Sequence, residues 1–216
     1  MAFGRFETPS ASAGRFEQSS ASAGRFETPS ASAGHSERPG ATKIVISGGF
    51  GSGKTTFVGA VSEIMPLRTE ALVTTASAGV DGLDATPHKN TTTVAMDFGR
   101  ITLAEDLVLY LFGTPGQRRF WFMWDDLIRG AIGAVILVDI RRLQDSFAAV
   151  DFFEARKLPF LIAINEFEGA PRHPEAAVRQ ALALREDIPI VTVDARDRNS
   201  ARAALIAVAE YALAAV

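Results

Sequence analysis

Cysteine is absent from this chain of 216 residues, and long hydrophobic runs are absent as well. Without thiols the chain forms neither disulfides nor thiolate metal sites. The longest uninterrupted apolar run, residues 130–138, is far shorter than the ~20 residues that a membrane-crossing helix needs. The N-terminus lacks the basic start and apolar core of a signal peptide and the Met-Gly start of a myristoylation site. These absences predict a soluble, cytoplasmic protein.

An excess of charge of either sign is also lacking. The chain has 22 Lys and Arg against 25 Asp and Glu, which gives a formal net charge of −3. No cluster of basic residues reaches the density of a nucleic-acid footprint, so we do not expect DNA or RNA as a partner. The length suits one full domain with a substantial core and is too short for two large ones.

The first forty residues are repetitive. The unit GRFE recurs every ten residues, beginning at Gly4, Gly14 and Gly24, with a decayed copy at Gly34. Repeats this short and this rich in Ser, Ala and Gly bury too little apolar surface to offset the entropy of ordering. We therefore predict a disordered tail over 1–40 and a folded domain over 41–216. The tail is either an inert linker or a multivalent docking or phosphorylation segment, with one Phe per repeat and ETPS at 7–10 and 27–30.

The remainder of the chain alternates between strand and helix patterns. Apolar strands are predicted at 43–47, at two places within 93–113, and at 133–140, 158–165 and 188–194. Helical segments are predicted up to about Met65 and at 118–129, 143–157, 174–186 and 200–216. Uninterrupted apolar strands indicate burial on both faces. The pattern predicts a mostly parallel six-stranded α/β sheet with one antiparallel edge strand and helices on both faces.

The stretch GGFGSGKT, Gly48–Thr55, fits the phosphate-loop pattern G-x-x-x-x-G-K-[ST]. Because a strand precedes it and a helix follows it, its backbone N–H groups and the helix N-terminus are expected to cradle phosphates. Lys54 is expected to reach the β- and γ-phosphates and to assist catalysis, and the Thr55 hydroxyl to bind Mg²⁺. The predicted phosphate-binding residues are Gly48, Gly49, Phe50, Gly51, Ser52, Gly53, Lys54, Thr55 and Thr56.

A second element must hold the metal and sense the γ-phosphate, and two places fit. In LYLFGTPGQRRF, residues 109–120, Gly116 is placed to contact the γ-phosphate and Gln117 to orient the attacking water, although Gly113 stands where an acid is usual. In AVILVD, residues 134–139, Asp139 ends an apolar strand as a metal-holding acid of an ATPase would. A strand-end cap is the other interpretation of Asp139. We favour the first element and hence GTP.

A first switch and a base-binding site are also expected. Thr93, with Thr92 second, precedes a strand as a switch threonine that binds Mg²⁺ and the γ-phosphate; a solvated Thr-rich loop is the alternative. In NEFE, residues 165–168, Asn165 is expected to tie this loop to the phosphate loop and Glu168 to accept the guanine N1–H and N2–H. In VDARD, residues 193–197, Ala195 is expected to offer its backbone N–H to the base and Arg196 to stack on it, beside Asp194.

From Lys43 to Val216 the chain resembles the bacterial Ras-like small GTPases, in particular the group that contains MglA and the GTPases of actinobacterial conservon operons (CvnD-type). GGFGSGKTT at 48–56, TTTVAMDFGRI at 91–101 and LYLFGTPGQRRFWFMW at 109–124 carry the resemblance. It implies a Ras-like P-loop fold, a GTP/GDP switch with Mg²⁺, a Roadblock-type regulator as partner, and a sensor-kinase-like protein encoded beside it. TPGQ without the acid is a feature of this group.

The run FWFMW at 120–124 predicts a partner surface, because one helix cannot bury five contiguous large residues; complete burial by packing is the alternative. No arginine is evidently placed to neutralise transition-state charge, so GTP hydrolysis is expected to be slow and partner-stimulated. Two other functions stay open: a P-loop ATPase that uses Asp139, and a degenerate scaffold that binds nucleotide weakly. Membrane association is expected only through partners, and the sequence predicts no oligomeric state.

Overall fold

The computed structural model describes residues 40–65, 67–74 and 91–215, and of 67–74 and 91–95 it describes the backbone alone. All but the last residue of the predicted tail, 1–40, lies outside the described residues, as does most of the stretch between the first helix and Thr93. None of the described helices has the length and apolarity needed to cross a membrane.

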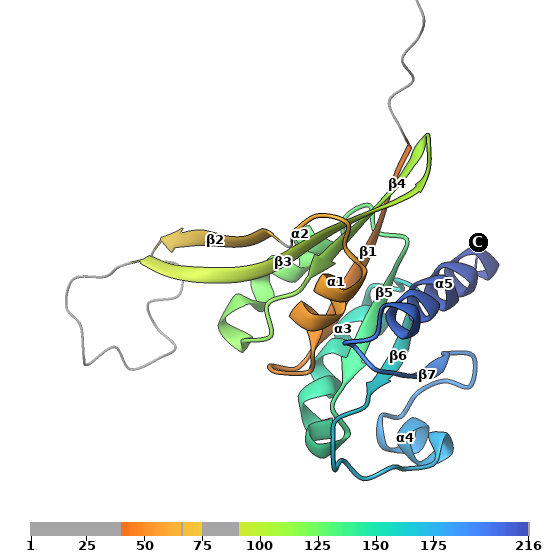
Figure 1. Ribbon diagram of the computed structural model, residues 1–216. Coiled ribbons are helices and arrows are strands. Elements are labelled where there is room, and N and C mark those ends of the chain that lie inside the picture. Colours follow the sequence, from red (N-terminus) through yellow and green to blue (C-terminus); the bar gives the residue numbers. More distant parts are fainter. Residues whose placement is uncertain (1–39, 66, 75–90, 216) are drawn as a thin grey trace, which may run out of the picture. The chain divides into compact units, whose positions relative to one another are not determined.

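Seven strands form one sheet in the order β2-β3-β4-β1-β5-β6-β7 (Figure 1). They are β1 (Gly40–Gly48), β2 (Leu67–Thr74), β3 (Thr91–Ala104), β4 (Leu107–Gly113), β5 (Gly133–Val138), β6 (Phe160–Asn165) and β7 (Ile190–Val193). The pairs β4·β1, β1·β5, β5·β6 and β6·β7 are parallel, whereas β3 is antiparallel to β2 and β4. The predicted mostly parallel α/β sheet is confirmed.

The sheet has one strand more than the six predicted. Strand β2 lies in a stretch where the sequence predicted no strand. It pairs along its whole length with the first half of β3, Leu67 opposite Phe98 and Thr74 opposite Thr91. The antiparallel strand β3 therefore lies inside the sheet and β2 takes the edge. Because β2 supplies a hydrogen-bonding partner, β3 begins at Thr91, before the point the sequence pattern indicated.

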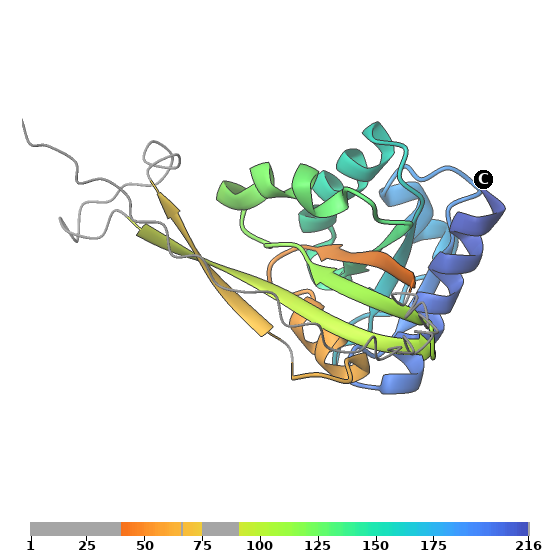
Figure 2. The same ribbon diagram turned by 90° about the horizontal axis from the view of Figure 1, so that it is seen from above.

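Helices cover both faces of the sheet (Figures 1 and 2). They are α1 (Lys54–Val61), α2 (Trp124–Ile128), α3 (Phe147–Ala155), α4 (Glu175–Ala181) and α5 (Arg198–Ala214), with 3₁₀ helices η1 (Arg118–Met123) and η2 (Ile140–Ser146). Two buried apolar clusters lie on opposite faces of the sheet. Ile44 and Ile46 of β1 pack with α1 and α5. Val45, between them, packs with α2, α3 and α4, as the alternation of side chains along a strand requires.

The predicted helix over 118–129 is divided. Its first part is the 3₁₀ helix η1, and only Trp124–Ile128 is α-helical. The tight 3₁₀ turn follows Gln117, at the carboxyl end of β4. This end of the parallel strands also carries the phosphate loop after β1 and the loops after β5, β6 and β7, which is where ligands bind in open α/β sheets.

Candidate nucleotide-binding site

The phosphate loop joins β1 to α1, as predicted, and Lys54 closes it. The Lys54 ammonium donates hydrogen bonds to the carbonyl oxygens of Gly48, at 2.9 Å, and Gly49, at 2.7 Å. Its side chain is buried, which lowers the pKa of Lys54 to about 8, although the Asp97 carboxylate acts in the opposite direction. Lys54 is therefore held at the position from which it can reach phosphate oxygens.

Two glycines of the loop are required by geometry. Gly48 has φ +136°, and a Cβ there would lie 2.3 Å from the carbonyl oxygen of Leu137 in β5. Gly53 has φ +103°, and a Cβ there would lie 2.5 Å from Nδ2 of Asn165. Such φ values favour glycine, so the glycines of the motif let the loop pack directly on β5 and on the loop after β6.

An acid that the sequence interpretation missed lies beside Thr55. The Thr55 hydroxyl donates a hydrogen bond of 2.7 Å to Oδ2 of Asp97, which comes from β3. A Cβ added to Gly113, where the usual switch acid would stand, would lie 2.9 Å from Cβ and 3.1 Å from Oδ2 of Asp97. Asp97 therefore occupies the space of the missing side chain. The signal in the sequence was a single acid within the apolar strand TVAMDFG.

The donor set fits a magnesium ion bound partly through the nucleotide. Thr55 and Asp97 offer a hydroxyl and a carboxylate oxygen, which are the hard ligands that Mg²⁺ prefers. Within the part of the chain that the structure describes, no group of three or more His, Cys, Asp or Glu could hold a metal by itself. Mg²⁺ commonly uses one or two protein ligands together with substrate phosphates and water.

The predicted switch threonine, Thr93, has its backbone within a strand. It lies inside β3, opposite Leu72 of β2, rather than in a loop before the strand, and its side chain is outside the described residues. Thr93 is four residues from Asp97, or about 13 Å along a strand at 3.3 Å per residue. Pairing with β2 extends the strand past Thr93, and the role predicted for Thr93 in binding Mg²⁺ and the γ-phosphate stays a prediction.

The segment after β4 is fixed above the phosphate loop. The Thr114 amide donates to the carbonyl of Ile46, at 2.8 Å, and the buried indole of Trp124 donates to the carbonyl of Pro115, at 3.3 Å. A Cβ on Gly116 would lie 3.0 Å from both the Lys54 ammonium and the Phe50 Cα. Gly116 thus contacts the phosphate loop where a γ-phosphate sensor is expected.

Gln117, the predicted water-positioning residue, is exposed. Its Oε1 accepts a hydrogen bond of 3.0 Å from Nε of Arg119. In this structure the Gln117 side chain is therefore held by Arg119.

Asn165 connects its own loop, after β6, to the phosphate loop, as the sequence predicted, and also to the loop after β7. Its buried side chain donates from Nδ2 to the carbonyl of Ser52, at 3.0 Å, and accepts at Oδ1 from the Ala195 amide, at 3.0 Å. The amide predicted to face the base is therefore used within the protein. Ala195 braces Asn165 instead, because the loop after β7 packs directly on the loop after β6.

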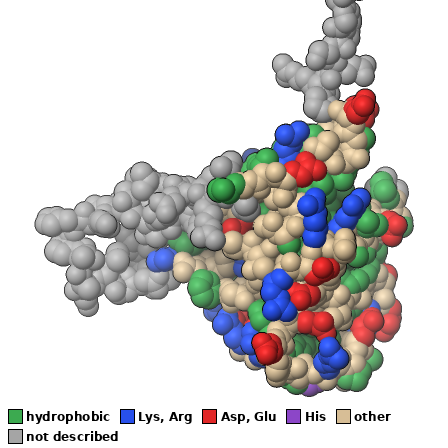
Figure 3. Space-filling view, viewed as in Figure 1, with side chains coloured by type: hydrophobic (Ala, Val, Ile, Leu, Met, Phe, Trp, Pro, Cys, Tyr) green, Lys and Arg blue, Asp and Glu red, His purple; other side chains and the backbone are tan. Residues whose placement is uncertain are grey.

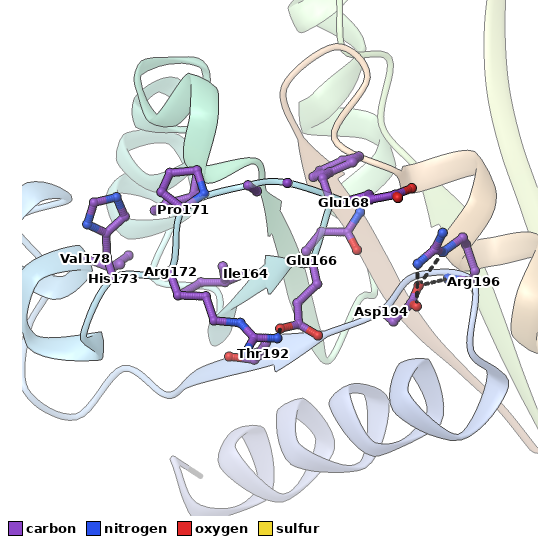
Figure 4. A pocket seen from close by; sticks show the side chains of 15 residues that line it. Ile164, Glu166, Glu168, Pro171, Arg172, His173, Val178, Thr192, Asp194 and Arg196 are labelled. Carbon is purple, nitrogen blue, oxygen red and sulfur yellow. Dashed lines mark hydrogen bonds and ion pairs between the residues drawn. The ribbon is translucent and has the colours of Figure 1, made fainter.

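A pocket of about 530 Å³ opens beside this brace (Figure 4). Glu166 and Glu168 both line it. Glu166 forms an ion pair of 3.0 Å with Arg172, which also lines the pocket. The resulting charge neutralisation leaves Glu168 as the carboxylate available to a ligand in this pocket.

Asp194 and Arg196 line the pocket and form an ion pair with each other (Figure 4). Nε and Nη2 of Arg196 lie 2.9 and 2.8 Å from the two carboxylate oxygens of Asp194. These hydrogen bonds, with one from the Arg196 amide, lower the pKa of Asp194 to about 2. The planar guanidinium is thereby held against the pocket.

Asp139 caps η2 and forms an ion pair with Arg141. Its two carboxylate oxygens accept from Nε and Nη2 of Arg141, at 2.9 and 2.7 Å, and one also accepts from the Arg141 amide. The Arg141 side chain bonds lower the pKa of Asp139. The guanidinium of Arg141 also stacks on Phe167, 4.1 Å from the ring centroid. The strand-end cap interpretation is confirmed, and both oxygens that an ATPase would use for its metal are occupied.

Residues 46–215 match the protein family described as conserved hypothetical ATP binding protein. The match spans well over half of the chain. The chain belongs to this family. An uncharacterized protein of Methanocaldococcus jannaschii, MJ1339, is 32% identical over 89 residues, which are 40% of this chain and 56% of that protein. This chain thus matches only about half the length of that relative.

The solved structures to which the chain is similar include a G domain and a small GTPase. The G domain of the FeoB iron transporter of T. maritima superposes with a TM-score of 0.52 at 17% identity, over 80% of this chain and 99% of that one. The Arl6 BBS3 small GTPase of Trypanosoma brucei, solved with the nucleotide analogue GppNp, gives 0.54 at 16% identity, over 81% and 99%. For this member of the ATP binding protein family, the comparisons show the fold of these G domains, and they support nucleotide binding.

The aromatic run of this family member is partly buried. Phe120 and Trp124 are buried, Trp121 packs against the second core cluster, and Phe122 is 57% exposed. The prediction that one helix cannot bury all five is therefore confirmed. Phe122 is the aromatic side chain that faces outward.

Proposed function

We propose that this protein is a guanine-nucleotide switch that binds GTP and GDP with Mg²⁺ and hydrolyses GTP slowly. The packing of Gly116 on Lys54 and Phe50 carries the proposal. A γ-phosphate held by Lys54 occupies the space next to Gly116, so gain or loss of that phosphate moves the segment after β4. This segment continues directly into η1, which bears Phe122.

The pocket chemistry favours guanine. Guanine presents two donors, N1–H and N2–H, on one edge, whereas adenine presents an acceptor at N1. A carboxylate accepts both guanine donors and repels the adenine acceptor. Glu168 supplies such a carboxylate in the pocket, while the negative charge of Glu166 is offset by Arg172. Arg196, which also lines the pocket, supplies a planar cation for stacking on the base.

ATP is the second candidate, and the description of the family favours it. The structural observation in its favour is that the Ala195 amide, expected to contact guanine O6, is bonded to Asn165. An ATPase mechanism that relies on Asp139 has less support, since Arg141 holds both of its carboxylate oxygens.

In the proposed cycle, Lys54 binds the β- and γ-phosphates, Thr55 and Asp97 hold the metal, and Gln117 orients the water. Here Oε1 of Gln117 accepts a hydrogen bond from Arg119, and in the proposed cycle Gln117 gives up this bond to orient the water. This favours slow turnover and acceleration by a partner that fixes the segment after β4. Bound Mg²⁺ supplies charge neutralisation at the phosphates.

A Roadblock-type regulator is our proposed partner, with a sensor-kinase-like protein in the same cytoplasmic complex, as in the MglA and conservon group. Phe122 supports a protein contact, because it is a large exposed aromatic beside the segment that senses phosphate. On the face shown in Figure 3, basic and acidic side chains are interspersed. Such a mixture favours a protein partner over nucleic acid or a direct membrane contact.

Calorimetric titration of the purified full chain with GDP, GTP and ATP, each with and without Mg²⁺, tests the proposal. We expect GDP and GTP to bind at least about tenfold more tightly than ATP, a difference of about 1.4 kcal/mol. The Lys54→Ala variant is the control for binding at the phosphate loop. Preference for ATP would select the second candidate, and absence of binding by the wild-type protein would leave only a scaffold that acts through protein contacts.

A further inference from the structure

Arg142, which lies in η2, contacts the phosphate loop. It follows β5 within η2, where its φ of −140° and ψ of 48° break the helical turn. Its Nη2 donates a hydrogen bond of 2.8 Å to the carbonyl oxygen of Phe50, a residue 92 positions earlier in the chain. The break in η2 is what directs this side chain at the loop.

Asp145 fixes the direction of the guanidinium. Its Oδ2 accepts from Nε of Arg142, at 2.8 Å, and from Nη2 as well. A Cβ on Gly49 would lie 2.6 Å from Cβ of Asp145. The turn that carries Arg142 and Asp145 therefore lies directly against the phosphate loop, and only a glycine at position 49 permits this approach.

Phe50 of the phosphate loop is contacted by both Gly116 and Arg142. On one side, a Cβ on Gly116 would lie 3.0 Å from the Phe50 Cα and the Lys54 ammonium. On the other, the Phe50 carbonyl accepts from Arg142. Arg142 thus lies at the part of the loop next to the γ-phosphate sensor.

The guanidinium keeps donors for a further anion. Among the described residues, no hydrogen bond uses Nη1 of Arg142, so two N–H groups remain for phosphate oxygens. Among the described arginines near the site, Arg142 is the one with a side-chain hydrogen bond to the phosphate loop. Arg141 holds Asp139, Arg118 lies over the Trp121 ring, and Arg119 holds Gln117.

We propose that Arg142 is a catalytic arginine supplied by the chain itself, an inference that rests on the proposed GTP hydrolysis. During the reaction the water oxygen forms a bond to the γ-phosphorus, and the bond from that phosphorus to the β–γ bridging oxygen breaks. The bonding electron pair stays on the GDP oxygen. One proton of the water remains on the released phosphate and the other passes to solvent. Arg142 keeps its own protons and donates N–H groups to the oxygens on which negative charge develops.

Three measurements on the full chain without a partner test this role. They are the rate of single-turnover GTP hydrolysis, the affinities for GTP and GDP, and the binding of aluminium fluoride to the GDP complex. The variants are Arg142→Ala and Arg142→Lys. Arg129→Ala is the matched control, because Arg129 forms the same i,i+3 pair with an aspartate, Asp126, on the surface. Aluminium fluoride probes the transition state, to which catalytic residues are complementary.

We expect Arg142→Ala to slow hydrolysis on the order of 10²-fold or more, since a catalytic arginine contributes about 10³–10⁵. GDP and GTP affinities stay within about threefold, and aluminium fluoride binding is lost. Arg142→Lys recovers part of the rate, and Arg129→Ala behaves as wild type. This split between rate and affinity separates catalysis from mere bracing of the loop.

Equal losses of affinity and rate in Arg142→Ala would overturn the inference, because they indicate a clamp on the phosphate loop. So would a variant that hydrolyses GTP as fast as the wild type. In both cases the wild-type protein still binds and hydrolyses GTP, and the proposed function stands. If the wild-type protein binds no nucleotide, the proposed function and this inference both fail.

Discussion

Asp97 fills the space that an aspartate at position 113 would occupy. Its Oδ2 accepts from the Thr55 hydroxyl, at 2.7 Å, and lies 3.1 Å from the point where a Cβ on Gly113 would stand. The carboxylate beside Thr55 of the phosphate loop thus comes from the antiparallel strand β3 and not from the neighbouring strand β4.

Replacing Asp97 with Asn should weaken nucleotide binding only when Mg²⁺ is present. The amide keeps the size of the side chain but removes the charge that attracts the cation. Loss of a group that supports a metal typically costs about 10–100-fold in metal affinity. Calorimetry with GTP in Mg²⁺ and in a chelator measures this, with Asp151→Asn, an exposed residue of α3, as control. Equal loss in both buffers would contradict a metal role.

Moving the acid back to β4 should restore function. Gly113→Asp alone should impair folding, because its Cβ meets Cβ of Asp97 at 2.9 Å. The double variant Asp97→Gly, Gly113→Asp removes the clash and returns a carboxylate to nearly the same point. We expect its Mg²⁺-dependent GTP affinity to exceed that of Asp97→Gly by about tenfold or more. A double variant no better than Asp97→Gly would show that the two positions are not equivalent.

Nucleotide affinity should fall as the pH rises through about 8. Burial lowers the pKa of Lys54 to about 8 in the ligand-free protein, and bound phosphate favours the charged ammonium. Above that pH the protein must therefore take up a proton on binding. Between about pH 8 and 10.5 the unfolded chain binds more protons at this residue, so the same shift makes the ligand-free protein more stable as pH rises.

Calorimetry in two buffers with different ionisation enthalpies counts these protons. We expect uptake to approach one proton per GDP at about pH 9 and to be small at about pH 7. The same heat in both buffers at the higher pH would contradict the assignment to Lys54.

Asn165 should be a stability residue as well as a site residue. Asn165→Ala leaves the buried Ser52 carbonyl and Ala195 amide without their partner. At about 1–3 kcal/mol for each orphaned group, we expect a loss of about 2–4 kcal/mol in the free energy of unfolding. Urea denaturation measures it, and the exposed Asn199→Ala in α5 should change stability by less than about 0.5 kcal/mol. A loss as small as that of the control would mean that water replaces both bonds.

Phe120 and Phe122 should separate folding from partner binding. Phe120 is 3% exposed and Phe122 is 57% exposed. Phe120→Ala should destabilise the fold by about 3–5 kcal/mol, whereas Phe122→Ala should leave stability within about 0.5 kcal/mol. If η1 carries the partner surface, Phe122→Ala should still abolish stimulation of GTP hydrolysis by a Roadblock-type protein. Full stimulation of this variant would place the partner elsewhere.

The sequence by itself determined the fold class and the core of the site. The spacing in GGFGSGKT placed Lys54 and Thr55, because local glycine and helix geometry suffices to build a phosphate loop. The apolar strands after it placed Asn165 correctly, since parallel strands end at one edge of the sheet.

Only the tertiary structure decided how distant segments complete that site. Asp97 reaches Thr55 from 42 positions away and Arg142 reaches Phe50 from 92. The register of β3, and with it the place of Thr93, depends on pairing with β2. The Ala195 amide was misassigned because the packing of two loops gives it to Asn165. Sequence patterns record local backbone preferences and burial periodicity, whereas these contacts depend on which side chains the folded sheet brings within hydrogen-bonding distance.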